Sequence, residues 1–425
     1  MSMGCDSRSG RPRAGLAWMW ALTVCLSPVT THAVAAAEEA ATVYEHVSGN
    51  PLKGGPNDVH ALILDETAVV FRCGVFDGAE IATDPAGITL AQAAANAESK
   101  GERRGVYTSR VIAAAFPFNE LVPSWNVDVP AGTGFRVDVR FGRAKDDFWT
   151  AFFYLGTWGI VPEFGEKVRK SEHGIVDVDC FRSREAFDRL QYRVILATSE
   201  PSRLPVVRRV ALAYSNTLDD AELARRYRQS IDPGPKERWA RRLPVPFRSQ
   251  LAEDEKIRGS ICSPTSTSMV MAYRGVERPT AEMAALIYDA EYEMYGTWLR
   301  AIEGAYLCGV PGYIERFGDW NAVKRHIANG QPVIASIRSE LGELRGAPYR
   351  RSDGHLIVIV GFDADGNVHV NDPAARTPAA GMTTYARADM EAVWLAHGGV
   401  GYLLQDPRKG DVPTSLPGTA VRETK

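Results

Sequence analysis

The hydrophobic pattern of this chain changes its period near residue 218. From about residue 41 to residue 214, apolar and polar residues mostly alternate, as in Phe135–Phe141 and Tyr192–Leu196. Such alternation is typical of β-strands that bury one face, and runs of turn formers such as Pro130–Gly134 separate the segments. Further along, apolar residues recur at helical spacing. The change of period and the length of 425 residues together predict more than one domain.

The first region is expected to fold as an all-β sandwich, because several short strands follow one another with turn signals between them. One segment departs from this pattern. In Ile88–Lys100, three alanines at positions 91, 94 and 95 recur at helical spacing and predict a helix.

The N-terminus resembles a secretory signal peptide covering residues 1–37. Arg8, Arg11 and Arg13 form a basic region, an apolar stretch follows over Ala14–Leu26, and small residues before Glu38 offer cleavage sites. The apolar stretch is short for a membrane span. The mature protein is therefore expected to be secreted or periplasmic, without a membrane span after signal removal. An uncleaved anchor is the alternative.

Composition excludes some functions and leaves the cysteines open. The net charge of −3 and the lack of a basic stripe interleaved with aromatics argue against nucleic-acid binding. The sequence has no C-x-x-C pair of the kind that binds zinc. The loop from Asp363 has Ala374 at the twelfth position, where a calcium loop needs Glu. No metal or organic cofactor is implied. Cys73 and Cys180 share strand parity with apolar neighbours, so they are either a disulfide or two buried thiols.

A basic linker over residues 218–242 is expected to separate the β-sandwich module (38–217) from a second domain (243–410), with a flexible tail at 411–425. Thr217 is predicted to cap a short helix beginning at Leu218. The run Asp232-Pro233-Gly234-Pro235 is expected to end it.

The second domain alternates predicted helices and strands. Helices are expected first and strands afterwards, the last two strands being joined by a hairpin turn at Asp363–Gly366. This order predicts an α+β domain. The predicted helices are Cys262–Gly275, Pro279–Tyr292 (capped by Thr280), Thr297–Leu307 and Asp319–Ala328, and the predicted strands are Pro332–Arg338, His355–Phe362 and Asn367–Asn371.

Cys262 is the candidate nucleophile. It stands where a helix begins, with Pro264 in the first turn, and the free N–H groups of a helix N-terminus favour a thiolate over a thiol. The alternative, a buried apolar cysteine, fits Cys308 better because Leu307 and Val310 surround it.

His355 and Asp372 are the candidate partners of this cysteine. His355 opens the apolar run Leu356–Gly361, at the mouth of a buried strand, where a general base is accessible to a nucleophile. Asp372 ends the neighbouring strand and is expected to accept the ring N–H of His355, which would fix its tautomer. The alternative for Asp372 is a turn-capping carboxylate before Pro373.

Four motifs resemble those of the bacteriocin-leader (double-glycine) peptidase-like group of papain-like cysteine peptidases, in the right order over about 160 residues. The resemblance implies a papain-like fold in which Gln250 donates to the oxyanion beside the Cys262 N–H. That group usually has glycine after the nucleophile, where this chain has Ser263. The motifs are Val245-Pro246-Phe247 with Gln250, Cys262–Ser266, Gly354-His355 with Gly361–Asp363, and Asn371-Asp372-Pro373.

A looser resemblance covers about 50 residues of the first domain. Segments Gly105–Arg110, Phe118–Leu121, Pro123–Trp125 and Gly132–Arg140 are similar to galactose-binding-like or lectin-like β-sandwiches. This resemblance implies a carbohydrate-binding or surface-binding module that uses Trp125, Trp149 or Trp158 as stacking platforms. The alternative is that these tryptophans belong to the core.

The fold class expected for the chain is thus an N-terminal all-β sandwich followed by an α+β papain-like cysteine peptidase domain. The expected function is hydrolysis of a peptide or amide bond through a Cys262 thioester, on a peptide or peptidoglycan-stem substrate. The N-terminal module is expected to contact a carbohydrate or cell-envelope surface. Acyl or peptidyl transfer and a non-catalytic surface-binding role are the alternatives.

Overall fold

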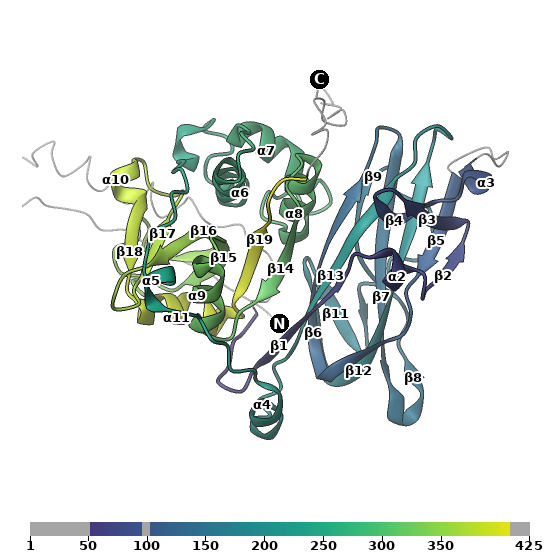
Figure 1. Ribbon diagram of the computed structural model, residues 1–425, viewed down its shortest axis with the longest axis horizontal. Helices are drawn as coiled ribbons and strands as arrows, with labels where there is room; N and C mark the ends of the chain where they lie inside the picture. Colours follow the sequence, from purple (N-terminus) through teal and green to yellow (C-terminus); the bar gives the residue numbers. More distant parts are fainter. Residues whose placement is uncertain (1–51, 96–102, 409–425) are drawn as a thin grey trace, which may run out of the picture. The chain divides into compact units, whose positions relative to one another are not determined.

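The structure is a computed structural model, and it describes residues 52–95 and 103–408. The predicted signal peptide and the predicted flexible tail lie outside the described residues. We call the β-rich part up to Asn216 the N-terminal module, and the part from Leu243 to Leu404 the C-terminal module (Figure 1). The predicted domain boundaries stay predictions.

The described strands of the N-terminal module form one thirteen-stranded antiparallel sheet. Two long strands, β6 and β12, pair with several neighbours, and they link strands that a sandwich would divide between two sheets. The β-rich prediction is confirmed, with one continuous sheet in place of two separate ones. The strands are β1 (Val59–Asp65), β2 (Val75–Asp77), β3 (Ala79–Thr83), β4 (Ala86–Leu90), β5 (Arg103–Thr108), β6 (Ile112–Asp128), β7 (Thr133–Arg143), β8 (Phe148–Trp149), β9 (Phe153–Gly159), β10 (Lys170–Ser171), β11 (Gly174–Asp177), β12 (Cys180–Thr198) and β13 (Val206–Asn216).

An aromatic core explains the alternating pattern of these strands. Phe118, Phe141, Phe153 and Phe181, from four different strands, have no exposed surface. The rings of Phe141 and Phe181 stack with centroids 3.9 Å apart. Burial of large aromatic side chains supplies much of the hydrophobic stabilisation of such a module.

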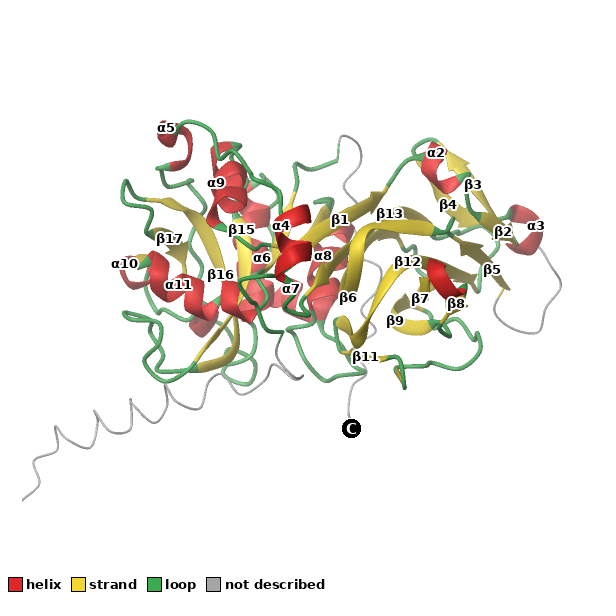
Figure 2. Ribbon diagram, turned by 90° about the horizontal axis from the view of Figure 1, so that it is seen from below, coloured by secondary structure: helices red, strands yellow, loops and turns green. Residues whose placement is uncertain are grey.

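The C-terminal module places helices before a six-stranded antiparallel sheet of order β14-β19-β15-β16-β17-β18. Figure 2 shows its helices and strands by type. The helices are α6 (Cys262–Tyr273), α7 (Thr280–Ile287), α8 (Trp298–Leu307), α9 (Trp320–Ala328), α10 (Pro378–Gly381) and α11 (Arg387–Val393). The strands are β14 (Gly312–Arg316), β15 (Val333–Ser339), β16 (Ser352–Phe362), β17 (Val368–Asn371), β18 (Met382–Tyr385) and β19 (Val400–Leu404). Shorter elements in the chain are α2 (Ala68–Phe71), α3 (Gln92–Ala95), α4 (Ala221–Tyr227), α5 (Lys236–Trp239), η1 (Ala144–Asp146), η2 (Gln250–Ala252) and η3 (Leu395–His397).

The predicted elements of this module are present, with shifted ends. The four predicted helices correspond to α6–α9, although α7 begins after Pro279 and stops at Ile287. The three predicted strands correspond to β15, β16 and β17. The hairpin turn is confirmed, since Asp363 N donates to Asn367 O and Gly366 has a φ of 84°.

Two predictions in the N-terminal module are wrong. Residues from Ile88 to Leu90 belong to β4, because Ile88 and Leu90 are fully buried between β3 and β13, and helix α3 begins only at Gln92. The rest of that predicted helix lies largely outside the described residues. Cys73 follows α2 and is exposed, so it does not continue a strand, and Cys73 and Cys180 are both free thiols.

Asp220, and not Thr217, caps the first helix of the linker. The Asp220 carboxylate accepts a hydrogen bond from Leu223 N at 2.9 Å and starts α4 at Ala221. Thr217 is held away from that role, because its N–H donates to Asn119 Oδ1 at 2.8 Å. Asp220 directly precedes Ala221 and so occupies the N-cap position, from which a side-chain oxygen reaches the free N–H groups of the first turn, whereas Thr217 lies four residues before the helix.

Side chains of β6 complete the hydrogen bonding of β14, which is the edge strand of the C-terminal sheet. Ser124 Oγ accepts from Ile314 N at 3.0 Å. Asn126 accepts from Gly312 N at 3.4 Å and donates to Gly312 O at 3.1 Å. These backbone groups would otherwise be unpaired at the sheet edge.

Helix α8 is also anchored by the N-terminal module. The β11–β12 turn carries Asp179, whose carboxylate accepts from Trp298 N at 3.0 Å and so caps α8. Burial raises the pKa of Asp179 to about 8, although the N–H groups of Trp298 and Leu299 oppose this. One turn further along α8, the buried Glu303 accepts from Val127 N at 3.1 Å.

Within the described ranges, no helix is long and apolar enough to cross a membrane.

Candidate active site

Cys262 is the first residue of α6. Its side chain is 6% exposed, and its N–H, like that of any first helical residue, has no carbonyl to donate to within the helix. The first turn of α6 is stabilised by Thr265, whose Oγ1 donates to Ile261 O at 2.6 Å. The sequence prediction of a helix beginning at the cysteine is therefore confirmed, and the local dipole favours negative charge on sulfur.

His355 lies on β16 and is fully buried. Its Nε2 is 2.8 Å from Asp372 Oδ1, and its ring also forms a hydrogen bond with Cys262. Burial alone would lower the pKa of His355, but the Asp372 carboxylate and the Cys262 hydrogen bond raise it to about 10. An imidazolium is therefore favoured between the thiol group and the carboxylate.

Asp372 directly follows β17 and is held by four donors. Besides His355, Ala374 N donates at 3.0 Å, Tyr385 Oη at 2.9 Å and Tyr349 Oη at 3.3 Å. Burial would raise the pKa of Asp372, but His355, Ala374 N and the Tyr385 hydroxyl lower it below its usual range. A carboxylate with this many donors stays ionised although it is buried.

Tyr349 and Tyr385 were missed by the sequence reasoning. Tyr385 ends β18, an unpredicted strand next to β17, and Tyr349 precedes β16 and meets the His355 ring edge-to-face at 5.0 Å. Neither has a characteristic spacing from Cys262 or His355. Only the pairing of β17 with β18 brings Tyr385 to the aspartate.

Gln250 belongs to the same cluster of segments. Its backbone N–H donates to Pro373 O at 2.9 Å, next to Asp372, and its Nε2 donates to Arg258 O at 2.7 Å in the loop before Cys262. The side chain is fully buried. One of the two Nε2 hydrogens is thus used by Arg258, and one remains for another acceptor.

Ser263 points to the interior. It is fully buried, and its Oγ lies 3.5 Å from Tyr402 Oη on β19. The position that is glycine in the resembling group is therefore occupied here by a hydroxyl that has a protein neighbour.

The other cysteine of the C-terminal module is not part of this cluster. Cys308 is 1% exposed, lies 3.8 Å from Met283 Sδ, and burial raises the pKa of its thiol. Two of the three tryptophans that were candidate stacking platforms are also core residues. Trp125 has no exposed surface and Trp158 is 8% exposed, whereas Trp149 is partly exposed.

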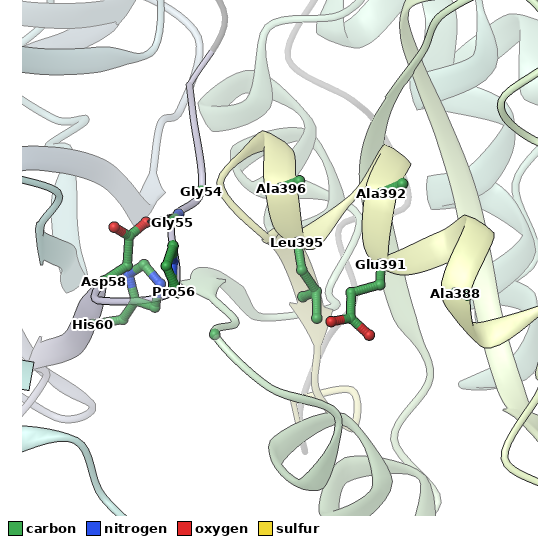
Figure 3. A pocket seen from close by; sticks show the side chains of 11 residues that line it. Gly54, Gly55, Pro56, Asp58, His60, Ala388, Glu391, Ala392, Leu395 and Ala396 are labelled. Atoms are coloured by element: carbon green, nitrogen blue, oxygen red, sulfur yellow. Dashed lines mark hydrogen bonds between the residues drawn. The ribbon is translucent and has the colours of Figure 1, made fainter. Parts of the chain in front are cut away.

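A cavity of about 590 Å³ lies elsewhere, between the start of β1 and the α11–η3 segment (Figure 3). Its polar lining residues are satisfied within the protein. Asp58 accepts from Gly55 N at 2.9 Å, and His60 lies 2.8 Å from Ser215 Oγ. Burial lowers the pKa of His60 and raises that of Asp58, so both are pushed towards their neutral forms. None of Cys262, His355 and Asp372 lines it.

A cysteine at a helix N-terminus, hydrogen-bonded to an imidazole that a carboxylate holds in place, is the arrangement of cysteine hydrolases. Comparison with known families agrees with this class. Residues 242–402 match the Peptidase C39 like family, and residues 64–215 match the Peptidase C39 N-terminal domain. The C-terminal module is therefore a C39-like peptidase domain, which confirms the resemblance found in its motifs.

Among solved structures, three similarities are weak. A double glycine motif protease from an AMS/PCAT transporter in complex with the leader peptide is 17% identical, over 39% of this chain and 94% of that chain, with a TM-score of 0.28. A family 29 carbohydrate binding module mutant, CBM29-2 D114A, is 10% identical over 42% and 99%, with a TM-score of 0.18. Tailspike protein 4 of bacteriophage CBA120 is 9% identical over 38% and 19%, with a TM-score of 0.16. The comparison with curated proteins gives no match.

Proposed function

We propose that this protein is an exported cysteine peptidase of papain-like arrangement, which hydrolyses a peptide or amide bond through a thioester on Cys262. The family match of the C-terminal module supports a peptidase-like hydrolase. The observation that carries the catalytic assignment is the position of His355, which forms hydrogen bonds with both Cys262 and Asp372.

The proposed reaction has two halves. The Cys262 sulfur, having given its proton to His355, attacks the carbonyl carbon, and the C–N bond breaks as His355 returns the proton to the leaving amine. Water, losing a proton to His355, then attacks the thioester, which releases the acid and the free thiol. Asp372 stabilises the imidazolium in both halves and keeps the ring oriented.

Gln250 is the proposed side-chain donor to the oxyanion. Its backbone contact with Pro373 and its Nε2 contact with Arg258 hold the amide between the Asp372 segment and the loop before Cys262. The remaining Nε2 hydrogen and the unpaired Cys262 N–H would stabilise the developing negative charge.

Substrate and location are part of the same proposal. The basic and apolar N-terminal sequence supports export, so the substrate would be a peptide or peptidoglycan stem in a secreted or periplasmic setting. The N-terminal module would hold the enzyme on a carbohydrate or cell-envelope surface.

Alkylation and cleavage by the full mature chain test this proposal. Iodoacetamide, at limiting concentration and followed by peptide mass mapping, is expected to modify Cys262 far faster than Cys308, and a peptide library is expected to be cleaved. The Cys262→Ala variant should lose cleavage, while Cys308→Ala, the matched control, should keep it. Equal alkylation of both cysteines together with no cleavage would contradict the proposal.

The same preparation separates hydrolysis from acyl transfer. With an excess of a small primary amine, products that carry the amine instead of a free carboxylate would identify a transferase. Hydrolysis products alone support the peptidase.

A further inference from the structure

One face of the N-terminal module carries regularly spaced arginines. On β7, Arg136 and Arg140 lie four residues apart, on the face opposite the buried Val137 and Val139, and on β12 Arg189 and Arg193 are also four residues apart. The register places Gln191 of β12 opposite Arg140. The arginines at this even spacing therefore share the face of the sheet opposite the apolar core.

Three aromatic rings lie between four of the arginines on this face. We call the series the arginine–aromatic ladder, and it runs Arg189, Trp149, Arg140, Phe152, Arg193, Phe164, Arg104. Successive guanidinium carbons lie over the ring centroids at 4.5, 4.6, 5.0, 4.1, 4.7 and 5.6 Å. Strands β7, β9 and β12, which carry or flank most of these residues, are neighbours in Figure 2.

The ladder carries more positive than negative charge. Arg193 forms an ion pair with Asp138, which also forms an ion pair with Arg136. Arg189 forms an ion pair with the exposed Asp147. For Arg140, no carboxylate of the described residues lies within ion-pair distance, and its Nε and Nη2 donate to the neutral Gln191 Oε1. Burial, and then the neighbouring Arg193 and Arg189, lower the pKa of Arg140. An external anion would relieve this repulsion.

The contacts of the rings narrow the kind of anion. Each of Trp149, Phe152 and Phe164 already has two guanidinium groups against it, so the rings are poor platforms for stacking nucleic-acid bases, on which single-strand binding depends. Recognition would instead use the N–H edges of guanidinium groups, which match carboxylates in a planar, bidentate way. A row of such groups suits a polymer with regularly repeated carboxylates.

We propose that the arginine–aromatic ladder binds an acidic polysaccharide through the carboxylates of its uronic-acid sugars. This inference deepens the proposed function, on which it rests, by naming the surface ligand that the N-terminal module would recognise. It also replaces the stacking role predicted for Trp125 and Trp158, which are buried, with a guanidinium-based site that includes Trp149.

Binding of polygalacturonate to the full mature chain tests this inference, with the Cys262→Ala variant used throughout so that binding is measured apart from cleavage. Isothermal titration calorimetry is expected to show binding that weakens as ionic strength rises. Dextran, oligothymidylate and a polyglycerol phosphate serve as neutral, nucleic-acid and phosphate probes. Equal or tighter binding of any of these three, or no binding of polygalacturonate, would overturn the proposal.

Two substitutions in the ladder and one outside it locate the site. Arg140→Gln and Arg104→Gln are each expected to weaken polygalacturonate binding about tenfold or more. Arg104 is exposed at the end of the ladder, so this variant keeps the test valid if Arg140→Gln fails to fold. Arg203→Gln, an exposed arginine of the same module, is the charge-matched control. Equal weakening in all three, or a lowered melting temperature in Arg140→Gln without weaker binding in either ladder variant, would assign the ladder a purely structural role.

The result of the polygalacturonate binding test does not depend on whether the protein cleaves peptides. With intact Cys262, both ladder variants should keep the wild-type rate on a soluble peptide. If polygalacturonate binds but no peptide is cleaved, the ligand assignment stands while the peptidase proposal fails.

Discussion

His355 Nε2 lies 2.8 Å from Asp372 Oδ1, and neither side chain has exposed surface. A buried pair of this kind is costly to break by removing one partner, because the remaining charge has no water to solvate it. The contact therefore couples the stability of the C-terminal module to its proposed chemistry.

Asp372→Asn is expected to reduce peptide cleavage by about 10³–10⁴-fold, as for an aspartate that orients a catalytic histidine. It should also lower the free energy of unfolding by about 3–5 kcal/mol. Initial rates and urea unfolding measure the two effects. Asp365→Asn, which changes an exposed aspartate of the β16–β17 turn, should alter neither. Full activity in Asp372→Asn would rule out the orienting role.

The stability of the protein should depend on pH through this pair. The pKa of His355 is raised from 6.5 to about 10, so its contribution is complete below pH 6.5 and is lost as pH rises through 10. The lowered pKa of Asp372 stabilises the folded state at higher pH, and this contribution is lost at acidic pH, when the carboxylate becomes protonated in the folded state. Urea unfolding between pH 6 and pH 10 should therefore show a steeper decline in wild type than in His355→Gln. Parallel curves would argue against a charged His355.

Tyr385→Phe should be more damaging than Tyr349→Phe. Both hydroxyls donate to Asp372 Oδ2, but Tyr385 does so at 2.9 Å and Tyr349 at 3.3 Å. Loss of a hydrogen bond to a charged group costs about 1.5–3 kcal/mol, so Tyr385→Phe is expected in that range and Tyr349→Phe below it. Thermal or urea unfolding of both variants measures the difference, and the reverse order would show that Tyr349 is the main support.

Asp179 offers a test of the contact that caps α8. Its raised pKa favours folding below pH 3.8, and this contribution is lost as pH rises through about 8. Asp179→Asn keeps an oxygen that accepts from Trp298 N and never ionises, so its stability relative to wild type should rise between pH 3.8 and about pH 8 and level off above that range. Asp179→Ala should lose about 1 kcal/mol at every pH, as for other caps. If the two variants behave alike in unfolding experiments, the cap does not contribute.

The fold could be predicted where one periodicity dominated. The alternation of apolar and polar residues predicted the N-terminal strands, and the helical spacing of apolar residues predicted α6–α9, because each of these elements buries a single apolar face. The helix predicted over Ile88–Lys100 is wrong at its start because the prediction relied on the spacing of the alanines. Ile88 and Leu90 are buried through the pairing of β4 with β3 and β13, which the local pattern does not reveal. The strands β14, β18 and β19 were not predicted, whereas β17, which is no longer than these, was found through the hairpin turn that joins it to β16.

The candidate site was more visible in the sequence than its supports. Cys262, Gln250 and Asp372 stand at element ends, which can be seen in a sequence, and His355 precedes a visible apolar run although β16 itself begins at Ser352. The structure brings these four segments together, whereas their catalytic roles stay predictions. Tyr349, Tyr385 and Asp179 act through contacts between elements that are far apart in sequence. Such contacts depend on sheet order and on packing between modules, which one chain's local pattern does not encode.

The hydrogen bonds that Ser124 and Asn126 give to β14 bear on how such an enzyme can be divided. If the gene were cut near residue 242, Gly312 and Ile314 would lose these partners, and the peptidase sheet would have an open edge. Open edges recruit strands from other molecules, so the shortened protein is expected to self-associate when it is produced alone. The peptidase half is therefore not an interchangeable cassette, and its transfer to a new fusion partner would require a replacement cover for that edge.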